Sequence, residues 1–104
     1  MSLLAPYASA AYECNATVRN ILIYTDGSVN ILHSGRNDYT VICNMNVERQ
    51  GVSPTVCGMW TAMLQLVKRK GGIVNLYFNG TGSCAELPVY SASPAPVYIG
   101  DVTP

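Results

Sequence analysis

Apolar runs separated by turn-forming residues divide this chain into a mainly β pattern with one helix. Residues 17–24 (TVRNILIY) are rich in β-branched and aromatic residues, and Asp26-Gly27 follows closely. Asp-Gly between two apolar runs favours a two-residue type I′ turn, in which both central residues need a positive φ. The pattern therefore predicts a hairpin in which Tyr24 pairs with Val29. Both of its faces are largely apolar, so it is either covered on both sides or curled into a barrel with an outer subunit contact.

A third strand, one helix and two further strands follow. Residues 39–45 form the third apolar run, residues 73–79 alternate between apolar and polar, and residues 97–102 give a short last strand. Ser53 is a good N-cap with Pro54 at the first helical position. Gly71 supplies the stop of the helix. Apolar residues recur between them at the spacing of one helical face: Val56, Met59, Trp60, Met63, Leu64 and Val67.

This order of elements, β-β-β-α-β-β, predicts a small five-stranded OB-fold barrel. An open α+β sheet with the same order is the alternative. Residues 14–104 are expected to form the single domain. Residues 1–13 contain small residues typical of a secretory cleavage site but lack a basic start. They are interpreted as a disordered remnant of an export signal or a vector-derived scar.

The composition is apolar and electrically balanced. Apolar residues make up 49% of the chain and charged residues only 12%, with 6 Lys plus Arg against 6 Asp plus Glu. This balance provides no basic field to attract nucleic acid or an anionic membrane. The chain has no apolar run long enough to span a membrane. The 7 tyrosines favour a surface that packs against copies of the chain or binds neutral ligands.

Four cysteines, each near the boundary of an expected element, indicate disulfides and an oxidising compartment, so the protein is expected to be secreted or periplasmic. Their spacing contains no close Cys pair of the kind that binds zinc. Of the three possible pairings, Cys43–Cys57 would tie the third strand to the helix, and Cys14–Cys84 would tie the first strand to the loop after the fourth. Four reduced cysteines in a cytosolic core are the alternative.

Residues 39–78 resemble the binding subunits of ring-forming bacterial toxins, the subtilase-cytotoxin and typhoid-toxin group. The matching pieces are Val41-Ile42-Cys43, Cys57-Gly58-Met59-Trp60 and, from Gly71, the strand that ends at Phe78. The resemblance implies an OB-fold, a Cys43–Cys57 bridge and a homopentameric ring that binds glycans and can carry a catalytic partner subunit. Nothing before Thr17 matches the sugar-contacting start of that family, so no glycan residue is carried over.

Two sets of residues are candidate binding positions. Asn75, Tyr77 and Asn79 form the outward row of the fourth strand and could bind a glycan, because aromatic faces stack on sugar rings and amides bind hydroxyls. A solvated or intersubunit face is the alternative. Lys68, Arg69 and Lys70 complement the dipole at the helix C-terminus. In a pentamer they could instead form a basic pore rim.

Catalysis has little support in the sequence. His33 is the only histidine, and its apolar neighbours favour a structural role over that of a general base. No carboxylate pair suggests acid–base chemistry, and no metal or cofactor site is expected. The sequence thus predicts a binding module that is not an enzyme, with a glycan or a partner protein as ligand. A secreted monomeric inhibitor or structural protein, and an OB-fold that binds single-stranded nucleic acid, are the alternatives.

Overall fold

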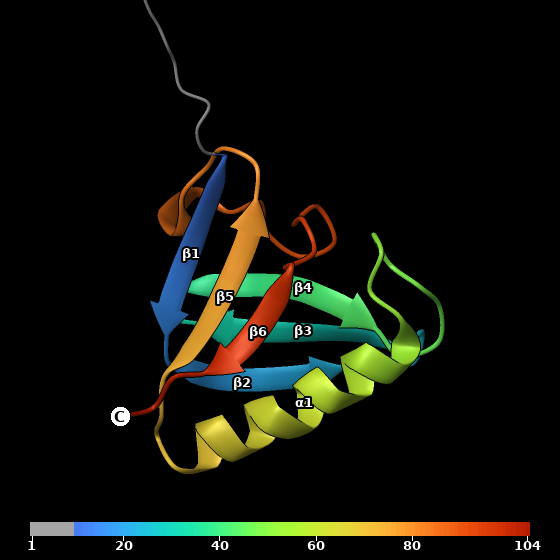
Figure 1. Ribbon diagram of the computed structural model, residues 1–104. Helices are drawn as coiled ribbons and strands as arrows, with labels where there is room; N and C mark the ends of the chain where they lie inside the picture. The colour runs from blue at the N-terminus through green and yellow to red at the C-terminus, as the bar shows by residue number, and fades with distance from the viewer. Residues whose placement is uncertain (1–9) are drawn as a thin grey trace, which may run out of the picture.

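The computed structural model describes residues 10–104, which form two three-stranded antiparallel sheets and one helix (Figure 1). The first sheet has the strand order β1-β5-β6, with β1 at Ala11–Ala16, β5 at Val74–Asn79 and β6 at Tyr98–Asp101. The second has the order β2-β3-β4, with β2 at Val18–Ile23, β3 at Ser28–His33 and β4 at Asp38–Asn44. Helix α1 spans Pro54–Arg69, and a short 3-10 helix, η1, spans Cys84–Glu86.

The mainly β class with a single helix is confirmed. Within residues 10–104 the two sheets are open, because no ladder of strand pairs closes them into one barrel. The described residues contain six strands rather than five, because residues 11–16 form an additional strand, β1, ahead of the first expected strand. Thr17 alone separates β1 from β2 as the chain passes from one sheet to the other.

The expected domain boundary at Cys14 needs correction. Strand β1 begins at Ala11 and pairs with β5 from Ala11↔Asn79 to Ala16↔Val74, so residues 11–13 belong to the folded domain. Ala10 is also described, and its carbonyl accepts the Gly80 N–H at 2.9 Å. Residues 1–9 of the predicted leader lie outside the described residues.

The predicted two-residue turn between β2 and β3 is wrong. Ile23, not Tyr24, pairs with Val29, and the Gly27 N–H donates to the Tyr24 carbonyl at 2.9 Å. Gly27 has a φ of +95°, and the Asp26 carboxylate accepts the Ser28 N–H at 2.8 Å. Such a side-chain bond stabilises a longer turn with a single left-handed residue. The shift of one residue places Ile21, rather than Leu22, beside Ile31 on the core side, whereas Ile23 at the end of the strand is 52% exposed.

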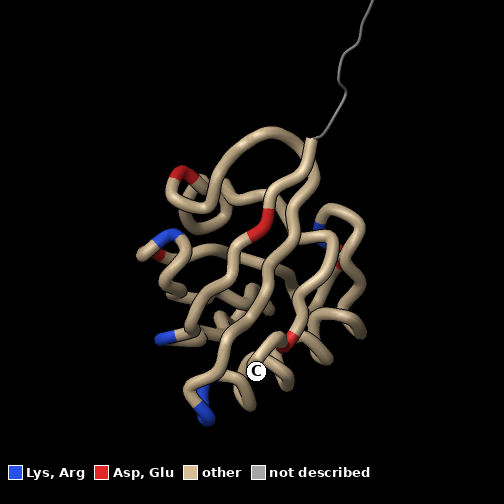
Figure 2. The backbone as a smooth tube through the Cα atoms, turned by 60° about the vertical axis from the view of Figure 1, so that its left-hand side comes forward, with Lys and Arg blue, Asp and Glu red and all other residues tan. Residues whose placement is uncertain are grey.

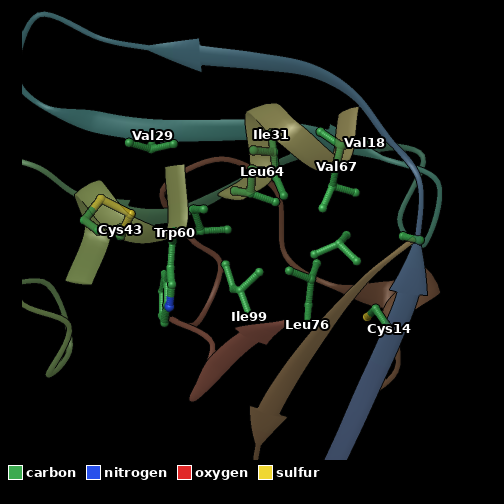
Figure 3. Packing of buried hydrophobic residues seen from close by; sticks show 14 of the residues in the cluster. Cys14, Val18, Val29, Ile31, Cys43, Trp60, Leu64, Val67, Leu76 and Ile99 are labelled. Carbon is green, nitrogen blue, oxygen red and sulfur yellow. A yellow bond between two sulfur atoms is a disulfide. The ribbon is translucent and has the colours of Figure 1, made fainter. Parts of the chain in front are cut away.

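The core lies between the two sheets and one face of α1. In Figure 3 the side chains of Ile31, Leu64 and Leu76 point into this space from β3, α1 and β5, and all three are fully buried. The predicted N-cap is confirmed, because the Ser53 hydroxyl accepts the Val56 N–H at 3.2 Å.

The apolar face of α1 is wider than the core that it covers. Val56, Met59 and Leu66 are 40%, 70% and 58% exposed, although the sequence pattern places Val56 and Met59 with the buried residues. Together with the half-buried Met63 they form an apolar strip along the outside of the helix, called here the outer helix stripe.

Candidate binding face

Both disulfides expected from the cysteine positions are present. Cys14 of β1 is bonded to Cys84 of η1, and Cys43 of β4 is bonded to Cys57 of α1, with Cα–Cα distances of 5.6 and 5.5 Å. The first bond fixes η1 against the edge of the β1-β5-β6 sheet. The second fixes the first turn of the helix to the β2-β3-β4 sheet. Each sheet is thus covalently linked to a helical segment, the first to η1 and the second to α1.

The predicted residues Asn75, Tyr77 and Asn79 lie on the side of the β1-β5-β6 sheet that faces away from the core. Side chains alternate between the faces of a strand, so neighbouring strands add Glu13 and Tyr98 at the Tyr77 level. This surface is called the β5 face, and its members are Glu13, Asn15, Asn75, Tyr77, Asn79 and Tyr98.

Two tyrosines form the centre of the β5 face. Tyr77 and Tyr98 are cross-strand partners, and their rings stack with centroids 5.0 Å apart and an interplanar angle of 11°. Tyr98 is 46% exposed and Tyr77 is half-buried. Cross-strand aromatic pairs hold each other in place, so the two rings present a fixed platform to solvent.

Asn75 organises the polar side of this platform. It is only 5% exposed, and its Nδ2 donates to Glu13 Oε1 at 2.7 Å and to Asn15 Oδ1 at 2.8 Å. The Glu13 and Asn15 side chains are themselves exposed. Asn75 thus positions its two neighbours, whereas Asn79, at the exposed end of β5, remains accessible.

Charge is sparse over this sheet, as it is along the whole chain (Figure 2). Strands β1, β5 and β6 contain no Lys or Arg, and Glu13 and Asp101 are their only acidic residues. The Lys70 Nζ lies 2.7 Å from Asp101 Oδ2, and this hydrogen bond, with those from Thr103, lowers the pKa of Asp101 to about 2. Asp101 pairs with Val74 and so lies on the opposite side of the sheet from Tyr77, which leaves Glu13 as the carboxylate of the β5 face.

The three predicted basic residues are divided between two environments. Lys68 and Arg69 lie in the last turn of α1, where positive charge complements the helix dipole, and with Gln65 they line a shallow surface hollow. Lys70 is the C-cap residue of α1, and its side chain forms a salt bridge with Asp101.

His33 lies in the core, as expected for a structural histidine. It is fully buried in β3, with Nε2 3.1 Å from Thr40 Oγ1 and no hydrogen-bond partner for Nδ1 within residues 10–104. Burial, reinforced by the nearby charge of Arg36, lowers the pKa of His33 from 6.5 to about 4. The imidazole is therefore neutral at physiological pH.

The buried histidine makes folding stability pH-dependent. Between pH 6.5 and about 4 the unfolded chain binds a proton at His33 that the folded chain excludes, so stability falls as the pH is lowered through this window. We expect a loss of roughly 2 to 3 kcal/mol between pH 7 and 4.5. Urea unfolding across this range measures it, and His33→Gln should remove most of the slope. An equal slope in His33→Gln would assign the effect to other groups.

Residues 10–104 contain neither a metal-binding cluster nor a helix that could span a membrane. No group of three or more His, Cys, Asp and Glu residues in the described range is placed to hold a metal ion. None of the helices in the same range is long and apolar enough to cross a membrane.

Sequence reasoning missed half of the β5 face. Glu13 falls within the expected disordered leader, although residues 11–16 alternate, with Cys14 and Ala16 on one side and Glu13 and Asn15 on the other, and such alternation indicates a strand. Tyr98 was placed in a strand, but no local pattern reveals that this strand lies next to Tyr77.

Searches against protein-family models, curated proteins and solved structures find no match to this chain.

Proposed function

We propose that this protein is an exported binding module, not an enzyme, whose β5 face recognises a glycan. The stacked pair Tyr77–Tyr98, flanked by Glu13 and Asn15, is the observation that carries this proposal. The C–H face of a pyranose ring packs on an aromatic platform, and carboxylate and amide oxygens accept hydrogen bonds from sugar hydroxyls. The low charge of these strands suits a neutral or weakly polar ligand better than a polyanion.

The absence of catalysis is part of the proposal. The only histidine, His33, is fully buried and neutral, so it is poorly placed to exchange protons with a bound substrate. Glu13 is already hydrogen-bonded to Asn75 and has no second carboxylate as cross-strand partner. These residues support positioning of a ligand rather than acid–base chemistry.

The proposed module further assembles into a homopentameric ring of OB-folds similar to toxin binding subunits. Three features favour this architecture. The chain passes from β1 to β2 through Thr17 alone, as in one bent barrel strand, and the parallel bridge Thr40↔Tyr90 brings the segment before β6 to the edge of β4. The outer helix stripe and Ile23, which is 52% exposed, offer apolar surface for subunit contacts.

In such a ring Lys68 and Arg69 would form the basic pore rim, with Lys70 pinned to Asp101. The pore could then hold a catalytic partner subunit. The two disulfides fit an extracellular or periplasmic location, where thiols are oxidised.

Removal of the exposed ring of the platform tests glycan recognition. On a printed glycan array, Tyr98→Ala should lose binding at least about tenfold, equivalent to about 1.4 kcal/mol, because the sugar loses the more exposed of the two rings. Tyr98→Phe keeps the ring and should retain most of the binding. Val97→Ala, a change in an adjacent residue that is 52% exposed, is the matched control and should bind as the unmodified protein does.

Light scattering of the oxidised protein accompanies this experiment. A mass near five times 11.2 kDa supports the ring, whereas a mass of 11.2 kDa favours the secreted monomeric inhibitor. If no glycan on the array loses binding in Tyr98→Ala, the β5 face is not a glycan site, whatever the mass.

A further inference from the structure

A second aromatic surface lies on the outward side of the β2-β3-β4 sheet. The strand register brings Asn20 beside Leu32 and Tyr39, and Leu22 beside Asn30 and Val41. Tyr24 and Tyr90 border these residues from the turn and from the segment before β6. This surface, called the β3 face, is defined by Asn20, Tyr24, Asn30, Tyr39 and Tyr90.

Tyr90 has an unusual backbone conformation, which hydrogen bonds to β4 hold in place. Its φ is +55°, a left-handed value that costs energy for a residue with a side chain. The Tyr90 N–H donates to the Tyr39 carbonyl at 2.9 Å, and the Val41 N–H donates to the Tyr90 carbonyl at 3.3 Å. The Tyr90 ring, 45% exposed, stacks on Tyr39 with centroids 5.7 Å apart. The strained conformation thus places this ring against the sheet.

Arg49 fixes the segment that carries Tyr90. Its guanidinium donates to the carbonyls of Ser91 and Ser93 at 3.2 and 2.7 Å, and to that of Val41 at 3.2 Å. The buried Ser93 hydroxyl lies 2.7 and 2.9 Å from the carbonyl oxygens of Val41 and Tyr90, which share its single proton. A platform fixed before binding loses little conformational entropy when a ligand arrives.

The phenol groups of the β3 face are oriented by amides. Asn20 Nδ2 donates to Tyr39 Oη at 3.0 Å, and Asn30 Nδ2 donates to Tyr24 Oη at 3.3 Å. Each phenol oxygen accepts a hydrogen bond, so its own O–H remains available to donate to a ligand. Asn30 is fully buried, and its Oδ1 has no hydrogen-bond partner within residues 10–104. Asn30 thus orients Tyr24 from beneath the surface, where a ligand does not reach it.

We propose that the β3 face binds a neutral saccharide, independently of the β5 face. None of the residues that define the β3 face is charged, which disfavours an ionic ligand. Stacked rings with outward O–H donors match the apolar faces and hydroxyl rims of sugars. The Tyr90 segment already pairs with β4, so an extended peptide cannot add as a strand at that edge.

Nuclear magnetic resonance titration of the ¹⁵N-labelled, oxidised protein with lactose, maltose and chitobiose tests this proposal. At about 10 mM sugar, which nearly saturates a site with a Kd near 1 mM, at least one of these disaccharides should shift the amide signals of residues 20–24, 39–41 and 90–93. Tyr90→Gly removes the ring and suits the left-handed backbone, and it should weaken binding at least about tenfold. Tyr39→Phe keeps the stack and loses one donor, so a smaller loss of about three- to tenfold is expected.

Tyr98→Ala is the matched control from the β5 face and should leave the affinity of the β3 face within about twofold. If Tyr98→Ala weakens the binding of no glycan, the proposed function of the β5 face is overturned, whereas the inference about the β3 face still stands. The inference is overturned if none of the three sugars shifts these signals, or if the shifts persist in Tyr90→Gly. It is also overturned if Tyr90→Gly abolishes self-association in light scattering but does not change sugar binding. The β3 face would then be a contact between copies of the chain.

Discussion

Replacement of both Cys14 and Cys84 by alanine should lower the free energy of unfolding by about 4 kcal/mol. The bond closes a loop with a sequence separation of 70 residues, and its loss gives the unfolded chain the entropy of that loop. It also releases η1 from β1, which lies at one edge of its sheet. Denaturant unfolding of the oxidised protein and the double variant measures the difference directly.

The second disulfide is the internal control for this prediction. Replacement of Cys43 and Cys57 by alanine opens a loop with a sequence separation of only 14 residues, for which the same model gives about 3 kcal/mol. Both cysteines are fully buried, so alanine is preferred to serine, whose hydroxyl would need a partner. A larger loss for this pair than for Cys14–Cys84 would show that local packing, rather than loop entropy, dominates.

Truncation of Leu64 to alanine is expected to cost about 3 to 5 kcal/mol. Leu64 is fully buried where α1 faces both sheets, so the substitution loses apolar burial and leaves a cavity between elements that cannot all close on it. Leu66→Ala makes the same chemical change on the same helix at a position that is 58% exposed, and it should cost less than about 0.5 kcal/mol.

Denaturant unfolding at two protein concentrations distinguishes folding from assembly in this pair. If both variants lose a similar free energy of unfolding at both protein concentrations, then Leu64 is not more deeply buried than Leu66, and the assignment of the core is wrong. If the loss for Leu66→Ala changes with concentration, the outer helix stripe makes subunit contacts, as the ring predicts.

Much of the local structure was readable from the sequence. The helix limits followed from Ser53 and Gly71, because capping depends on residues within one turn. The strand at residues 73–79 followed from its alternation. The turn after Tyr24 was placed correctly but given the wrong register, since the Asp26 side chain and contacts with Asn46 selected a longer turn.

The candidate site was only partly readable. Tyr77 and Asn79 were identified from the outward row of one strand, but Asn75 is buried because Glu13 and Asn15 of the neighbouring strand cover its amide. Tyr39 and Tyr90 are far apart in sequence, and nothing near either residue indicates that their rings stack. Such pairs depend on which strands become neighbours, a choice made by the whole core.

The sequence by itself determined the strand and helix segments, the low charge and the oxidised cysteines, because each depends on residue type and short-range periodicity. Only the tertiary structure decided that the sheets remain open and which tyrosines meet on the β5 and β3 faces. The physical reason is that an alternating strand specifies two faces but not its neighbours. Burial of the common core selects those neighbours, and with them the side chains that share a surface.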